Sequence, residues 1–100
     1  MDIYQAINAA MENPPNNRDD ATALLSHYSP DVQAQLVTAV YLGKNLLNQS
    51  KIPAGEDLSR TVSEREEFPD ILAKHSHVMV QYLGKLKECA ANSNYDLRKL

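Results

Sequence analysis

The side chains best suited to chemistry in this sequence are three histidines and one cysteine: His27, His75, His77 and Cys89. His75 and His77 are two positions apart on an expected helix, so they point about 200° apart around it and cannot share an ion. Cys89 lies about 21 Å further along the same helix axis than His75. His27 belongs to another helix, so a shared site would have too few ligands, because zinc takes about three or four from the protein. The sequence therefore predicts no metal site and no cofactor.

Cys89 also lacks the neighbours that would make it a nucleophile. A catalytic nucleophile needs a base beside it, and that base is itself held by a third group. Lys85 lies one helical turn before Cys89, and no histidine falls within helical reach. Ser76 stands between two histidines, but adjacent residues on a helix point apart. We therefore expect no enzyme, and we expect Cys89 to be a small apolar side chain near the end of a core helix.

The histidines have simpler structural interpretations. His75 falls between Ile71 and Met79 on the apolar side of its helix, where a partly buried imidazole is expected to find a hydrogen-bond partner. His77 falls on the polar side and is expected to be solvated. His27 lies near the end of a short helix, where the helix dipole favours a positive charge.

The composition is that of an ordinary globular domain. The chain has 100 residues, of which 43 % are hydrophobic and 23 % charged, so we expect one domain over residues 1–100. No apolar run approaches the roughly 18–20 residues of a membrane helix. Residues 1–5 lack the basic start and apolar run of a signal peptide, and a lone cysteine fits a reducing compartment. The sequence therefore predicts a cytoplasmic protein without a membrane segment.

Helical periodicity covers most of the chain and sets the expected fold class. The strongest start signals are Ser29-Pro30-Asp31 and Phe68-Pro69-Asp70, each with a proline in the first helical turn. A weaker, charged helix is expected to face inward through Leu58, Val62 and Arg65. We expect an all-α fold, a compact bundle of four to five helices in which two are long and two or three short. The expected helices are 2–12, 19–28, 30–48, 56–67 and 69–91, with one further turn in the tail 95–100.

A short segment occurs in both long helices. Tyr41-Leu42-Gly43-Lys44 recurs as Tyr82-Leu83-Gly84-Lys85. A glycine inside a helix costs about 1 kcal/mol relative to alanine, so two at matching places indicate a packing reason. Each glycine either relieves crowding inside the core or marks a close contact with a second chain, and the sequence leaves both interpretations open.

The first of these segments also resembles a known family. Residues 36–44, Leu-Val-Thr-Ala-Val-Tyr-Leu-Gly-Lys, are similar to the Leu-Val-x-x-x-x-Leu-Gly-Arg/Lys segment of the DUF3775 family of small bacterial proteins of unknown function. The stretch from His75-Ser76 to Tyr82-Leu83 resembles that family's second segment. The resemblance covers roughly residues 20–90, although no tryptophan precedes the glycine and the loop at 50–56 is not the expected acidic one. It implies a helical fold and a bacterial source, and no activity, because the family has none assigned.

With catalysis and metal binding set aside, the sequence favours a binding role. The two long helices carry more apolar surface than a small bundle needs to bury, since Val37, Tyr41, Val80 and Leu83 widen their stripes, and an exposed apolar patch marks a partner surface. We expect a small non-catalytic protein-interaction module that binds another protein or a second copy of itself as a homodimer. The expected partner-binding residues are Val37, Tyr41, Gly43, Lys44, Tyr82, Leu83, Gly84 and Lys85.

The charge distribution keeps two alternatives open, although the formal net charge is only −3. The segment 56–67 is acidic and could serve a small inhibitor or immunity-type protein that binds one target. The segment 74–100 is basic, and a nucleic-acid-associated regulator would use Lys74, Lys85, Lys87, Arg98 and Lys99. We do not expect nucleic acid as the partner, because neither long helix has the dense basic face of a recognition helix.

Overall fold

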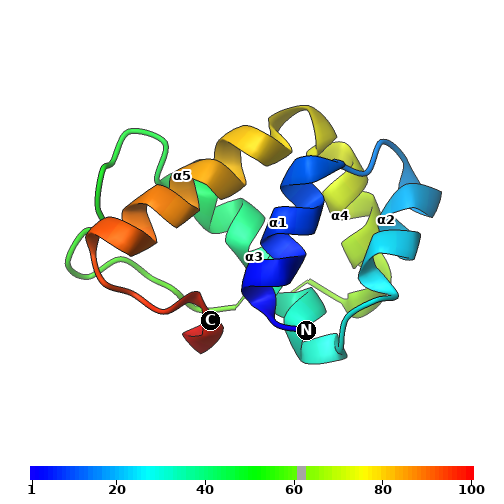
Figure 1. Cartoon of the computed structure of the whole chain (residues 1–100), viewed down its shortest axis with the longest axis horizontal. Coiled ribbons are helices and arrows are strands. Elements are labelled where there is room, and N and C mark those ends of the chain that lie inside the picture. Colours follow the sequence, from blue (N-terminus) through cyan, green and yellow to red (C-terminus); the bar gives the residue numbers. More distant parts are fainter. Residues whose placement is uncertain (61–62) are drawn as a thin grey trace.

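All regular structure in the computed structural model, which describes residues 1–60 and 63–100, is helical (Figure 1). The α-helices are α1 (Ile3–Glu12), α2 (Arg18–Leu25), α3 (Pro30–Asn45), α4 (Phe68–Lys74) and α5 (Met79–Asn92). Three 3-10 turns, η1 (Arg65–Glu67), η2 (Ser76–Val78) and η3 (Leu97–Lys99), lie between and after them. The predicted all-α class is confirmed, and the helices pack into a bundle of 36 × 24 × 22 Å.

Side-chain caps fix where the first three helices begin. The Asp2 carboxylate accepts from the backbone N–H groups of Tyr4 and Gln5, while the Gln5 side chain accepts from the Asp2 N–H at 2.8 Å. Asn17 accepts from a backbone N–H at the start of α2. Ser29 accepts from the Val32 N–H ahead of α3, which has proline at its first position. These caps satisfy N–H groups that have no partner inside the helix.

Helix α3 forms the centre of the molecule, as its apolar composition predicted. It packs against α1, α4 and α5, and Figure 1 shows it crossing behind α1 and below α5. Leu36, Val37, Ala39 and Val40 are fully buried. The helix ends at Asn45, before the predicted residue 48.

The prediction of one continuous helix over 69–91 is wrong, because the chain breaks at His75. The imidazole Nδ1 of His75 lies 2.7 Å from the Ile71 carbonyl oxygen, which the His75 backbone N–H also contacts at 3.2 Å. The imidazole is thus a second partner for the last carbonyl of α4 that still has its helical N–H partner. The chain then passes through η2, and α5 leaves in a new direction (Figure 1).

The predicted helix over 56–67 is wrong in the part of it that the structure describes. Residues 56–60 and 63–64 are not helical, and only Arg65–Glu67 form a 3-10 turn. Val62, which was expected to face inward, lies outside the described residues. Leu58 does pack against the core.

The C-terminal tail closes the bundle and is tied to distant parts of the chain. The Tyr4 hydroxyl donates to the Asp96 carboxylate at 3.2 Å and accepts from the Leu97 N–H at 2.9 Å. The buried Gln35 amide donates to the Leu100 carbonyl oxygen at 3.1 Å, and an Arg60 Nη donates to the same oxygen at 2.9 Å. The side chains of Leu97 and Leu100 are buried. The predicted turn in the tail is therefore present and forms part of the core.

Candidate functional sites

The residues expected to bind a partner divide into a buried and an accessible group. Val37, Gly43 and Leu83 are buried inside this chain's own core, so the expectation that they lie at a partner surface is corrected. The accessible group consists of the exposed Lys44 and the half-buried Tyr41, Tyr82, Gly84 and Lys85. The broad apolar faces of the long helices are thus buried mainly inside this chain's own core. Among the described residues, only Met1 and Val80 are large hydrophobic side chains with high exposure.

The packing reason at Gly43 lies within the chain. A Cβ atom on Gly43 would lie 2.0 Å from the Tyr82 carbonyl oxygen, which belongs to the backbone of α5. Gly43 therefore lets the backbones of α3 and α5 touch. At Gly84 the nearest atom to such a Cβ would be the flexible Met11 Cε at 3.5 Å, an ordinary contact. Of the two interpretations, relief of crowding explains Gly43, while Gly84 has no comparable constraint.

Three aromatic side chains from different elements meet at the surface and form what we call the tyrosine–histidine patch: Tyr41, His75 and Tyr82. The ring centroids of Tyr41 and His75 are 5.5 Å apart in an edge-to-face arrangement, and those of His75 and Tyr82 are 6.3 Å apart. All three side chains are half-buried. The hydrogen bond of His75 to Ile71 confirms the expected role of this histidine.

A shallow cleft and several charges adjoin the tyrosine–histidine patch. The cleft has a volume of about 310 Å³ and lies between α3 and residues 57–59; its lining residues are Thr38, Tyr41, Leu42, Asn45, Asp57 and Ser59. Hydrogen bonds from Ser59 lower the pKa of the Asp57 carboxyl, which is therefore an anion at neutral pH. Lys44 is exposed one turn after Tyr41. Lys85, one turn after Tyr82, donates to the Glu88 carboxylate at 2.8 Å, and this bond raises the pKa of Lys85.

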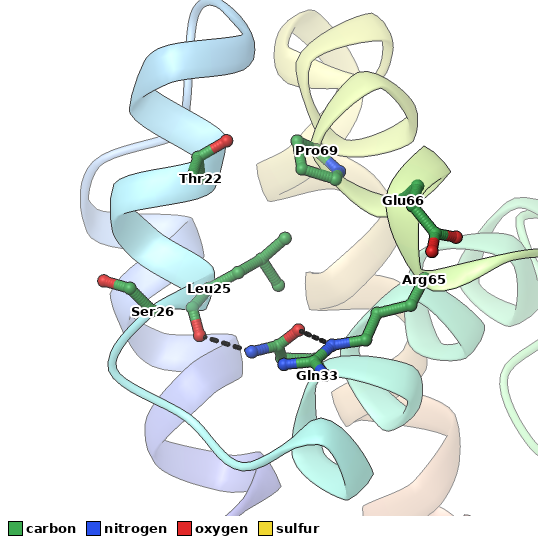
Figure 2. A pocket seen from close by; sticks show the side chains of 7 residues that line it. All are labelled: Thr22, Leu25, Ser26, Gln33, Arg65, Glu66 and Pro69. Atoms are coloured by element: carbon green, nitrogen blue, oxygen red, sulfur yellow. Dashed lines mark hydrogen bonds between the residues drawn. The ribbon is translucent and has the colours of Figure 1, made fainter.

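A second cleft, of about 400 Å³, lies between α2 and α4 (Figure 2). Its lining residues are Thr22, Leu25, Ser26, Gln33, Arg65, Glu66 and Pro69. The Gln33 side chain is 7 % exposed; its Nε2 donates to the Leu25 and Tyr28 carbonyl oxygens, and its Oε1 accepts from Arg65 Nε at 3.4 Å. Arg65 was expected to face inward from a helix. It does reach Gln33, but from a 3-10 turn.

The other two histidines and the cysteine that the sequence singled out lie outside both clefts. His77 and His27 are exposed, the latter at the edge of a third hollow beside α2, and Cys89 is fully buried. Within residues 1–60 and 63–100, no group of three histidine, cysteine or carboxylate side chains is arranged to hold a metal ion. No described helix is long and apolar enough to cross a membrane.

The two charged segments differ in how far they are neutralised. In the basic segment, Arg98 pairs with Asp96 at 3.1 Å and Lys85 pairs with Glu88. In the acidic segment, Glu64, Glu66 and Glu67 are exposed. No family model, curated protein or solved structure matches the chain.

Proposed function

We propose that the protein is a non-catalytic interaction module that forms a homodimer through the tyrosine–histidine patch. The observation that carries the proposal is the meeting of Tyr41, His75 and Tyr82 at one surface. Tyrosine is enriched at protein interfaces, because its ring offers apolar contact area and its hydroxyl a hydrogen bond. Neither tyrosine hydroxyl forms a hydrogen bond with residues 1–60 or 63–100, so both remain available to a partner.

A second copy of the chain suits this surface because the surface is self-complementary. A two-fold interface places the same patch against itself, so each group must be able to face its own kind. Tyrosine hydroxyls and a neutral imidazole both donate and accept hydrogen bonds. The same area holds the exposed cation of Lys44 and the anion of Asp57, so a two-fold axis lets Lys44 of one copy approach Asp57 of the other.

The proposal is tested by the mass of the protein in solution over a range of concentrations. Light scattering behind a sizing column should report a mass rising towards twice the 11.2 kDa of the single chain. Tyr41→Ala should weaken the dimer at least about tenfold, as expected for a central interface tyrosine. A strictly monomeric wild-type protein at high concentration would overturn the proposal.

A charge swap separates this interface from a general effect on folding. Lys44→Glu should weaken the dimer, and the further change Asp57→Lys should restore it, because the opposite charges then meet in reversed order. Lys87→Glu is the matched control, since Lys87 is an exposed lysine on α5 that bonds to Asn8 of α1 and lies outside the patch. A dimer that responds equally to Lys44→Glu and Lys87→Glu does not use the proposed surface.

A further inference from the structure

Two polar contacts link the elements that form the cleft between α2 and α4. At one end, Arg18 of α2 and Asp70 of α4 form an ion pair of 2.6 Å. At the other end, the buried Gln33 amide joins the end of α2 to Arg65. Leu25, which is 4 % exposed, provides an apolar floor between these ends, and Pro69 lines the same space. Figure 2 shows the Leu25 side chain pointing between the two helices.

The guanidinium group of Arg65 is positioned rather than free. Two backbone carbonyls fix the Nε2 of Gln33, so the Gln33 Oε1 has a defined place and accepts from Arg65 Nε. This arrangement uses Nε and leaves the two Nη groups of Arg65 without a recorded partner among the described residues. A guanidinium fork matches the two oxygens of a carboxylate, and a group already held in place loses less freedom on binding. The cleft therefore has a prepared site for an anionic group.

The other lining residues narrow the class of that anion. Glu66 lines the same cleft, and its negative charge disfavours a doubly charged anion such as phosphate. Figure 2 shows the Glu66 carboxylate on the side of the turn away from Leu25, whereas Leu25 and Pro69 can contact an apolar part of the ligand. The volume of about 400 Å³ lies near the lower end of the roughly 300–1,000 Å³ of ligand sites.

From these features we infer that the cleft between α2 and α4 binds an apolar carboxylate, held by Arg65 at its carboxylate and by Leu25 and Pro69 at its apolar part. Two sources supply this chemistry, a free amino acid such as leucine and the carboxyl end of a peptide. The site is remote in sequence from the tyrosine–histidine patch and shares none of its residues, so it is independent of the proposed dimer.

Titration of ¹⁵N-labelled protein with leucine, N-acetyl-leucine and a short peptide ending in leucine tests the inference. The backbone amides of Leu25, Ser26 and Gln33 should shift with saturable curves. Stronger binding of leucine than of the other two identifies the free amino acid as the source, and stronger binding of the peptide identifies a peptide end. Leucinamide and the amidated peptide lack the carboxylate and should bind at least about tenfold more weakly.

Variants on the exposed rim attribute the binding to the guanidinium group of Arg65. Arg65→Gln should weaken every carboxylate ligand at least about tenfold, and Arg65→Lys should recover only part of the loss because it lacks the fork. Arg98→Gln is the control, since Arg98 is exposed and lies in the tail. The inference is overturned if no ligand shifts these amides at millimolar concentration, if the amidated ligands bind equally well, or if Arg65→Gln and Arg98→Gln behave alike.

Discussion

Replacing glycine by alanine should change the stability of the protein in opposite directions at the two matching positions of the repeated segment. Gly43→Ala would place a methyl group 2.0 Å from the Tyr82 carbonyl oxygen, and relief requires α3 and α5 to move apart. We expect a loss of about 3 kcal/mol in the free energy of unfolding. Gly84→Ala meets only Met11 Cε at 3.5 Å, so the better helix propensity of alanine should stabilise the protein by up to about 1 kcal/mol. Urea unfolding measures both, and equal effects would show that the helices are not in contact at Gly43.

The buried thiol of Cys89 contributes to the stability of the fold at neutral pH, and this contribution is lost at alkaline pH. Burial raises the pKa of the Cys89 thiol, which means that the fold favours the neutral form. In the unfolded chain the thiol ionises at its ordinary pKa, so the stabilisation is present below that value and lost as pH rises through the raised pKa. Cys89→Ala should therefore cost about 1 kcal/mol at pH 7 and less at pH 10. A constant difference between the two pH values would contradict this.

Residue chemistry was predictable where it depends on helix periodicity. The apolar face of α5 indicated a buried Cys89, and the same reasoning indicated a hydrogen-bonded His75; both are confirmed. Gln33 carried no such signal, because its role arises only when the end of α2 returns to α3. The sequence likewise did not predict what packs against Gly43, because it could not show whether the neighbouring backbone belongs to the same chain or to a second one.

At the scale of elements, the break between α4 and α5 has no marker in the sequence. Neither proline nor glycine occurs between Lys74 and Val78, and the apolar residues on both sides fit one continuous helix. At the break, the imidazole of His75 adds a second contact to the Ile71 carbonyl oxygen, which the His75 backbone N–H also reaches. A side-chain contact of this kind can stabilise a helix end without any change in the hydrophobic pattern. The start of α3 could be predicted from Ser29-Pro30, because a capping residue and a first-turn proline act within one helical turn.

The two neighbouring histidines provide a matched test of this element boundary. His75→Ala removes the contact with Ile71 and the packing against Tyr41, and it should lower the free energy of unfolding by about 1–2 kcal/mol. His77→Ala changes an exposed side chain and should stay within about 0.5 kcal/mol. Thermal unfolding at low protein concentration, where self-association contributes little, measures both. If the variants are equally stable, the imidazole does not maintain the break.

At the scale of the molecule, composition and periodicity were enough for the all-α class and for the central place of α3. Composition and periodicity did not predict that the C-terminal tail closes the bundle. The hydrogen bond between Tyr4 and Asp96 joins residues 92 positions apart, and no local pattern in either segment indicates it. Both clefts depend on the same kind of information, because each forms where segments distant in sequence meet.

The contact between α1 and the tail should respond to the loss of a single hydroxyl group. Tyr4→Phe keeps the ring and its stacking under Arg98 at 5.8 Å, but removes the acceptor of the Leu97 N–H and the donor to Asp96. The unpaired N–H should cost about 1–2 kcal/mol. Tyr95→Phe is the control, because no hydrogen bond of the Tyr95 hydroxyl is recorded from the described residues. Hydrogen exchange should show faster exchange of the Leu97 amide in Tyr4→Phe alone; unchanged protection there would mean that burial of Leu97 and Leu100, rather than this hydroxyl, holds the tail in place.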